Sequence, residues 1–281
     1  MSLRDGISLV LWQTGISEFI RRAWGQNARF VLMFHGVASR SHPDILQSVQ
    51  PSLSRADLHA VLFWLRPRYT FLTAAEFMDT DKPGVLLTFD DGLANNHVNA
   101  LPVLQEFDAP AVFFVSTQHV TDPQNWLPAT RLLARKGWGM EETVPEEIAR
   151  DFYNGMSQEQ LTECAVHPLI TIGSHTISHP FLTRCEPQEL KEELVGSKQV
   201  LEKISGRKVD YFAYPTGDYD TRVAQAVRAA GYRAAFAMDA LHVASPLFEI
   251  PRVGIYASDA PYLSLKLSGL HRRPLRSGQY L

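Results

Sequence analysis

Two adjacent carboxylates end an apolar run in this sequence. Residues 85–92 read VLLTFDDG, so Asp90 and Asp91 lie side by side, where like charges repel. Aspartate and glycine are both common in turns, and a plain turn is one interpretation of this stretch. The other is a catalytic pair at the mouth of a sheet, and the rest of the chain has to decide between them.

A pair of histidines offers a second chemical signal. His175 and His179 lie four residues apart in SHTISHP, residues 174–180, a spacing that brings both imidazoles to one side of a helical turn. A carboxylate from Asp91 would complete a set of two histidines and one aspartate around zinc or a similar divalent ion, with positions left for water and substrate. Taken alone, such a pair is more often two ordinary histidines.

The elements around these residues follow the pattern of a parallel α/β fold. Short β-branched or aromatic runs alternate with stretches of helical spacing. Strands are predicted at 30–34, 85–89, 110–115, 169–173, 209–214 and 232–238, and helices after Ser54 and at 96–107, 186–204 and 221–230. Three polar loops, at 90–91, 174–180 and 214–220, each follow a predicted strand. Because the carboxyl ends of parallel strands converge on one face, we expect these loops to be neighbours.

Composition indicates one globular domain. The 281 residues are 45% hydrophobic and 20% charged, with a net charge of −3. That balance allows a substantial core and gives no basic surface for nucleic acid, which is therefore not expected as a partner. Cys164 and Cys185 have no short-spaced motif and are expected to be free thiols.

Two segments depart from the α/β alternation. Residues of about 118–165 have no sheet period and are predicted to be an insertion with short helices, either a lid or wall of the site or a surface excursion. Residues 1–28 are predicted to be an amphipathic helical extension, in which residues 7–24 either contact a membrane or partner, or pack on their own domain. No signal peptide is recognised, so the expected location is cytoplasmic, with membrane association as an option.

With both motifs in place, the chain resembles the polysaccharide deacetylases of the fourth carbohydrate esterase family, which includes chitin and peptidoglycan N-acetylglucosamine deacetylases. The resemblance rests on TFDDG at 88–92 and on SHTISHP; VLMFHGV at 31–37 and IPRVGI at 250–255 are similar to opening and closing segments of such enzymes. It covers about residues 31–254. It implies a distorted (β/α)7 barrel as a single catalytic domain spanning 29–281.

The resemblance also implies roles for individual residues. Asp90 would be the general base, and Asp91, His175 and His179 would bind one divalent metal ion, with zinc expected first and cobalt or nickel as alternatives. A backbone N–H after Pro215, that of Thr216, would donate to the oxyanion, with Tyr214 in the same motif. His35 is a candidate catalytic acid or substrate-binding group, or else a structural histidine.

Three family motifs are altered or doubtful here. Ala213 stands where an arginine normally orients the catalytic aspartate, so either another cation replaces it or Asp90 is tuned differently. Thr216 replaces a tyrosine. Asp239 is a doubtful remnant of the fourth motif, and His271 has one residue too many for the spacing of the fifth.

The implied function is a metal-dependent hydrolase that removes an acetyl group from an N-acetylated sugar or glycan in surface polysaccharide metabolism. Two alternatives stay open. One is a degenerate member that binds carbohydrate without turnover, and the other is an amidase that acts on a small non-sugar molecule. The shape of the pocket would distinguish a glycan from a small amide.

Overall fold

The computed structural model describes residues 10–16, 19–20, 28–40, 53–127, 131, 135 and 144–268. Its strands are β1 (Arg29–Phe34), β2 (Val37–Ala38), β3 (Leu53–Ser54), β4 (Gly84–Phe89), β5 (Ala111–Val115), β6 (Ile170–Ser174), β7 (Tyr211–Ala213), β8 (Ala234–Ala237), β9 (Ile250–Pro251) and β10 (Val253–Gly254). Its α-helices are α4 (Arg55–Leu65), α5 (Ala74–Asp79), α6 (Leu101–Glu106), α7 (Thr117–Thr121), α9 (Glu146–Ile148), α10 (Gln158–Val166), α11 (Pro187–Lys191), α12 (Ser197–Ser205), α13 (Thr221–Ala229) and α14 (Ala260–Lys266).

The described residues also include shorter helical segments. Three have π-type geometry, η1 (Asn96–Ala100), η3 (Ala149–Tyr153) and η5 (Glu192–Gly196). Three are 3₁₀ turns, η4 (Leu182–Arg184), η6 (Pro215–Gly217) and η7 (Pro246–Phe248). The helix predicted at 186–204 is therefore α11, η5 and α12 in succession, ending at Gly206 in the left-handed conformation that commonly caps helices.

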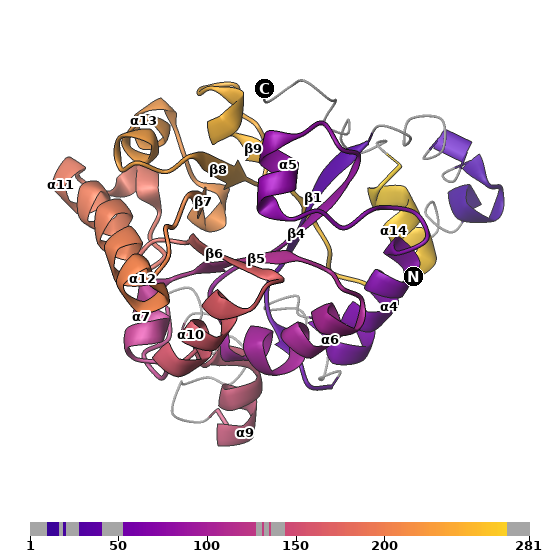
Figure 1. Ribbon diagram of the computed structural model, residues 1–281, viewed down its shortest axis with the longest axis horizontal. Coiled ribbons are helices and arrows are strands. Elements are labelled where there is room, and N and C mark those ends of the chain that lie inside the picture. Colours follow the sequence, from indigo (N-terminus) through magenta and orange to yellow (C-terminus); the bar gives the residue numbers. More distant parts are fainter. Residues whose placement is uncertain are drawn as a thin grey trace.

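Eight parallel strands of the described chain form one sheet in the order β10-β1-β4-β5-β6-β7-β8-β9. β9 pairs with β8 and β10 pairs with β1, and only Arg252 separates these two short strands. The segment 250–254 thus pairs with both β8 and β1 and nearly closes the sheet into a barrel, with helices outside it (Figure 1). The predicted distorted (β/α)7 barrel is confirmed, and its seventh strand position is this interrupted segment.

Side chains alternate between the two faces of the barrel wall, as strand geometry requires. On β4, Val85, Leu87 and Phe89 pack in the large cluster beneath the outer helices, whereas Leu86 belongs to a second cluster. Because that second cluster draws on strands all round the sheet, it fills the barrel interior. The end of the barrel at which the strands begin is closed by α5, whose Phe77 and Met78 belong to the interior cluster. The carbonyl of Phe77 accepts a hydrogen bond from Arg29 at the start of β1.

Local signals account for the helix that follows Ser54. The Ser54 hydroxyl accepts a hydrogen bond from the Asp57 amide, and the Asp57 carboxylate accepts one from the Ser54 amide, so the predicted N-cap is a complete capping box. The predicted free thiols, Cys164 and Cys185, are both buried and form no disulfide bond. Within the described residues, no helix has the length and apolar character needed to cross a membrane.

The described part of the predicted insertion holds the short helices α7, α9 and η3, together with α10, a regular helix that packs on β6. Trp126, Ile148, Phe152 and Tyr153 form a small core with Ala38 of β2. Most of the predicted extension at 1–28 lies outside the described residues, as does His271.

Candidate active site

Strand alternation carries Asp90 into the mouth of the barrel. Leu86 faces the interior, so Thr88 and Asp90, two and four residues later, continue on the same side. The Asp90 amide still donates to the Phe34 carbonyl at 3.0 Å, which keeps Asp90 in strand register. Asp91 then turns away with a positive φ of 75°, so the two neighbouring carboxylates point in different directions.

The strand end of β6 delivers the first histidine. The His175 amide donates to the Val115 carbonyl at 3.0 Å, and the Ser116 hydroxyl donates to the His175 carbonyl at 2.8 Å. Across the barrel mouth, the Nδ1 of His175 lies 2.8 Å from the carbonyl oxygen of Ala213 at the end of β7. Only a protonated Nδ1 can donate to that carbonyl, so Nε2 keeps its lone pair for another partner.

Asp91, His175 and His179 converge as predicted, but residues 175–179 form a loop with positive φ at Thr176 and His179 rather than the helical turn that their spacing suggested. The Oδ1 of Asp91 lies 3.7 Å from the Nε2 of His175 and 3.6 Å from the Nε2 of His179, and the three ligand atoms all lie within 4.8 Å of one another. Tetrahedral zinc with bonds of about 2.0–2.2 Å keeps its ligand atoms about 3.3 Å apart, so this set is near metal-binding spacing. The Nδ1 of His179 is buried and has no hydrogen-bond partner among the described residues.

Burial keeps His175 neutral, as a metal ligand must be. Burial lowers the pKa of His175 to about 4; the charge of Asp90 opposes this shift and that of His179 reinforces it. Neutral imidazole nitrogens and one carboxylate are a donor set that zinc and similar divalent ions accept. The residues therefore fit the metal site that the sequence predicts.

The missing motif arginine is supplied from elsewhere in the chain. Arg252, the residue between β9 and β10, donates from Nη1 to Oδ1 of Asp90 at 2.7 Å and from Nη2 to Oδ2 at 2.9 Å. Its guanidinium lies 5.5 Å over the ring of Phe114, which shares the interior cluster with Ala213. Arg252 is thus the substitute cation that the sequence analysis left open. A charged residue within the apolar segment IPRVGI was the signal that could have revealed it.

Arg252 also sets the charge state of Asp90. Burial would raise the pKa of Asp90, but the positive charge of Arg252, with smaller contributions from His175 and His35, holds that pKa at about 2. Asp90 is therefore ionised at neutral pH, and its two oxygens are fixed in one orientation.

A further histidine supports the turn at Asp91, and no motif in the sequence pointed to it. His119 of α7 is fully buried; its Nδ1 lies 3.2 Å from the Asp91 carbonyl, and its Nε2 accepts the Leu127 amide at 3.1 Å. Burial lowers the pKa of His119 to about 4. This neutral imidazole joins the insertion to the turn that carries Asp91, and the Met156 amide adds a bond to the Gly92 carbonyl at 2.9 Å. The described part of the insertion therefore contacts this turn.

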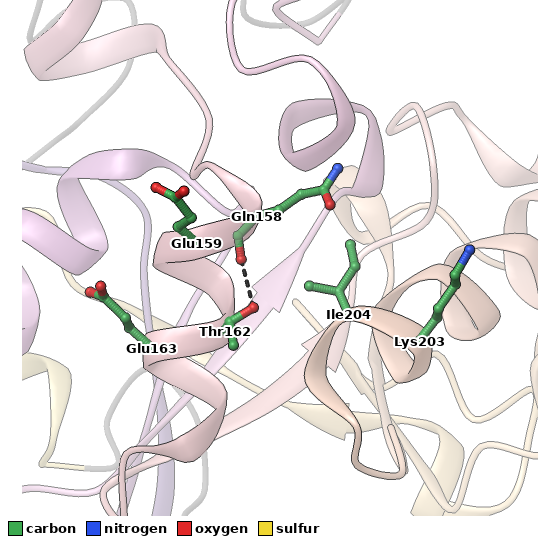
Figure 2. A pocket seen from close by; sticks show the side chains of 6 residues that line it. All are labelled: Gln158, Glu159, Thr162, Glu163, Lys203 and Ile204. Atoms are coloured by element: carbon green, nitrogen blue, oxygen red, sulfur yellow. Dashed lines mark hydrogen bonds between the residues drawn. The ribbon is translucent and has the colours of Figure 1, made fainter.

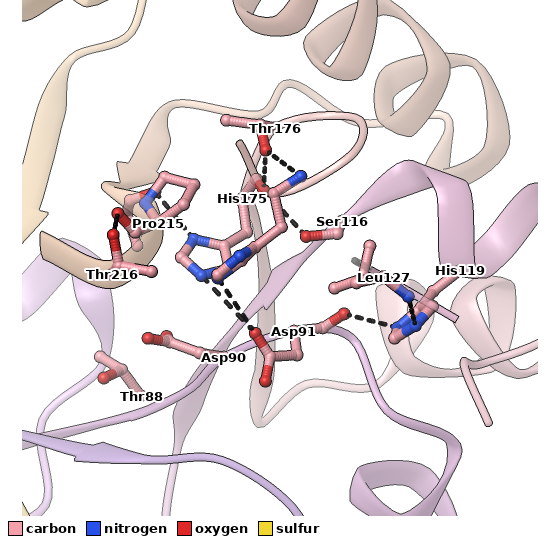
Figure 3. A network of polar contacts seen from close by, with 12 residues as sticks. Thr88, Asp90, Asp91, Ser116, His119, Leu127, His175, Thr176, Pro215 and Thr216 are labelled. Atoms are coloured by element: carbon pink, nitrogen blue, oxygen red, sulfur yellow. Dashed lines mark hydrogen bonds and ion pairs between the residues drawn. The ribbon is translucent and has the colours of Figure 1, made fainter. Parts of the chain in front are cut away.

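Figure 3 shows how these groups are arranged, with Asp91 and His175 facing each other at the centre. Pro215 and Thr216 lie on the side of Asp90, and His119 and Leu127 lie on the opposite side (Figure 3). Thr216 has a positive φ of 55° in the η6 turn, next to the Ala213 carbonyl that binds His175. The predicted oxyanion-binding loop therefore lies beside the metal cluster.

The remaining predicted residues differ in their placement. His35 is half-buried at the end of β1, where its ring stacks on Tyr256 at 6.2 Å, and its Nδ1 has no hydrogen-bond partner among the described residues. The Tyr214 side chain is buried and its hydroxyl donates to the Phe248 carbonyl at 3.0 Å, and its place in the oxyanion and substrate site stays a prediction. Asp239 is exposed two residues after the end of β8.

A groove of about 500 Å³ lies on the outside of the barrel, between α10 and α12. Figure 2 shows its lining, which consists of Gln158, Glu159, Thr162, Glu163, Lys203 and Ile204. None of these residues belongs to the cluster at the barrel mouth, so the groove is separate from the candidate active site.

Comparison with known proteins places the chain in a family. Residues 78–235, more than half of the chain, match the family model described as polysaccharide deacetylase. YxkH of Bacillus subtilis, whose name assigns it to the polysaccharide deacetylases, is 25% identical over 211 residues, 72% of this chain and 62% of YxkH. The chain thus spans less than two thirds of the length of that relative.

A further relative and two solved structures are also similar to this chain. A poly-beta-1,6-N-acetyl-D-glucosamine N-deacetylase of Staphylococcus aureus is 23% identical over 231 residues, 79% of this chain and 74% of that protein. The fold is similar to the Streptococcus pyogenes deacetylase PplD in complex with acetate (TM-score 0.67, 20% identity, covering 86% of this chain and 98% of PplD). It is also similar to IcaB from Ammonifex degensii (TM-score 0.64, 23% identity, 86% and 97%). The chain belongs to the polysaccharide deacetylase family.

Proposed function

We propose that this protein is a metal-dependent deacetylase that hydrolyses the acetamido group of an N-acetylated sugar within a glycan. The observation that carries the proposal is the joint placement of two units at the barrel mouth. One is the cluster of Asp91, His175 and His179, and the other is Asp90, held by Arg252. Family membership supports the same reaction class.

Asp91, His175 and His179 would hold one divalent ion, and zinc suits two imidazoles and a carboxylate best. When bound, the ion supplies Lewis-acid polarisation of a carbonyl and lowers the pKa of water. Cobalt and nickel accept the same donors, so the metal content of the purified protein has to be measured.

The protein residues would divide the proton transfers between them. Asp90, kept ionised and oriented by Arg252, accepts a proton as water attacks the acetyl carbonyl. The Thr216 amide donates to the carbonyl oxygen as that oxygen gains negative charge. His35 gives a proton to the departing sugar nitrogen, so that the products are acetate and a free amine. The contribution of His35 to the electrostatics of Asp90 supports this assignment.

The substrate class rests on the relatives. The Staphylococcus aureus relative is named for poly-beta-1,6-N-acetyl-D-glucosamine, which makes a β-linked N-acetylglucosamine polymer or its precursor the first substrate to try. The degenerate, non-catalytic alternative was suggested by Ala213 and by the missing fourth motif, and Arg252 removes the first of these two reasons. No observation favours a small non-sugar amide.

The decisive experiment compares Asp90→Asn with His175→Ala in full-length protein. Asp90→Asn should keep about one divalent ion per chain and lose acetate release, because the three ligands are unchanged and the proton acceptor is replaced; Arg252 also loses its ion-pair partner in this variant. His175→Ala should lose the ion as well. A wild-type protein that is fully active without metal, or unchanged turnover in Asp90→Asn, contradicts the proposal. O-acetylated glycans assayed beside N-acetylated ones identify the bond that is cleaved.

A peripheral attachment of the N-terminal segment is a separate proposal. Four large apolar side chains there are exposed, Val10, Trp12, Ile16 and Phe19, the last of these at 73%. Apolar side chains beside Arg21 and Arg22 suit the surface of an anionic membrane. Co-sedimentation with anionic vesicles should be lost in Trp12→Ser/Phe19→Ser, and equal sedimentation of the two proteins contradicts the attachment. A cytoplasmic location stays a prediction.

A further inference from the structure

The loop that carries both histidine ligands adopts a conformation that its own residues disfavour. Thr176 and His179 have positive φ angles of 70° and 59°, in a region that side-chain-bearing residues rarely enter. Within the loop, the Thr176 hydroxyl accepts the His179 amide at 3.0 Å. The loop therefore needs support from outside itself to keep the two imidazoles together.

Glu193 supplies that support from the neighbouring helix. Its Oε2 accepts the amides of Ile177 at 2.7 Å and Ser178 at 3.1 Å, and its Oε1 accepts the Ser178 hydroxyl at 2.7 Å. Glu193 is only 8% exposed and forms no ion pair with any described residue. A buried carboxylate is costly unless it is hydrogen-bonded, and all three of its bonds go to the segment between the two ligands.

The helix around Glu193 is shaped to receive the loop. Glu193 lies in η5, a π-type turn within the helical run, and such turns often occur at functional sites. A Cβ on Gly196 would lie 2.9 Å from the Cδ1 of Ile177, so a larger residue at this position would require the end of the Ile177 side chain to shift. One residue later, the Ser197 hydroxyl lies 2.9 Å from the hydroxyl of Ser174. Three neighbouring positions of one helix thus contact the loop on both sides of His175.

We propose that Glu193 is a positioning residue that sets the separation of the His175 and His179 imidazoles and thereby the metal affinity of the site. This inference rests on the proposed function, because it assumes that the cluster binds a divalent ion. Groups that orient metal ligands from behind typically contribute 10- to 100-fold to affinity. Glu193 contacts neither ligand side chain in this structure and acts through the backbone of the loop.

The test measures zinc dissociation constants for the full chain by competition with a chromophoric chelator. Glu193→Ala should bind zinc 10- to 100-fold more weakly and should recover near-wild-type kcat in excess zinc, because the ligands themselves are intact. Glu193→Gln should stay within about threefold of wild type, since its amide oxygen can accept both backbone amides and the Ser178 hydroxyl can accept its N–H. Glu192→Ala is the matched control, an exposed glutamate one residue earlier.

Two outcomes with the Glu193 variants overturn the inference. One is an unchanged zinc affinity in a folded Glu193→Ala protein. The other is a loss in Glu193→Gln as large as that in Glu193→Ala, which would assign the effect to charge rather than to hydrogen-bond geometry. If Glu193→Ala does not fold, Ser178→Ala, which removes only the hydroxyl bond, should weaken zinc binding severalfold, and no change there also overturns it. A wild-type protein that binds no zinc refutes the proposed function instead.

Discussion

Removing the guanidinium of Arg252 should reduce both stability and turnover. The ion pair with Asp90 has two short bonds of 2.7 and 2.9 Å, between side chains that are 1% and 4% exposed. In Arg252→Met, Asp90 would be left as a buried carboxylate without its cation. Removing one partner from a buried pair typically lowers the free energy of unfolding by about 3–5 kcal/mol.

Turnover should fall because the base is no longer held in place. A displacement of about 1 Å in a catalytic group can reduce the rate about 100-fold, and Arg252→Met should show a loss of that order in kcat. Burial, which raises the pKa of Asp90, would then act without the opposing charge of Arg252. The pKa should rise from about 2 to above its ordinary value of 3.8, and the acid limb of the pH–rate profile should move upward with it.

Urea unfolding and the pH dependence of acetate release measure these effects. The double variant Asp90→Asn/Arg252→Met removes both charges and should be more stable than Arg252→Met alone. Arg233→Met is the matched control, because Arg233 pairs with Asp79 at the surface and should contribute no more than about 1 kcal/mol. If Arg252→Met unfolds within 1 kcal/mol of wild type and keeps its kcat, the assignment of Arg252 is wrong.

Two further predictions concern the turn and the buried histidines. Gly92→Ala should lower the free energy of unfolding by roughly 2 kcal/mol or more in urea titrations, because φ is +72° and the new Cβ would lie 2.7 Å from Val115. Gly206→Ala is the control, since Gly206 also has a positive φ but open space around it, and this variant should lose less stability. Equal losses in the two variants would exclude the clash with Val115. In metal-free protein, burial lowers the pKa of both His119 and His175 from 6.5 to about 4, so their stabilisation is complete above pH 6.5 and is lost as the pH falls toward 4, by roughly 3 kcal/mol for each. His119→Asn should remove about half of that pH dependence of unfolding, and an unchanged dependence contradicts the attribution.

Local pattern was enough to predict most of the elements. Alternating apolar runs and helical spacing placed β1, β4, β5, β6, β7 and β8 to within a few residues. Ser54 marked a helix start because its capping box is formed within four consecutive residues. The interrupted closing strand was indicated only by the resemblance of IPRVGI to a closing segment, because two-residue strands on each side of Arg252 leave no periodicity to detect.

The sequence by itself also determined which candidate ligands meet. Asp91 directly follows one strand and the His175–His179 segment follows another, so the convergence of strand ends was sufficient to predict that they are neighbours. The close approach of the two imidazoles was not set by a helical turn, because Thr176 and His179 adopt positive φ in a loop. The roles proposed for these residues depend on residue types that stand close together in the sequence.

Only the tertiary structure decided what holds that set in place. Arg252 is 162 residues from Asp90 along the chain, His119 is 28 from Asp91, and Glu193 is 16 from Ile177. Each acts from a different part of the fold, and apart from the charge within IPRVGI no local pattern in the sequence marks any of them. The physical reason is that burial and hydrogen-bond partners are properties of the packed barrel. A lone charged or imidazole side chain acquires its role only when packing determines which group it faces.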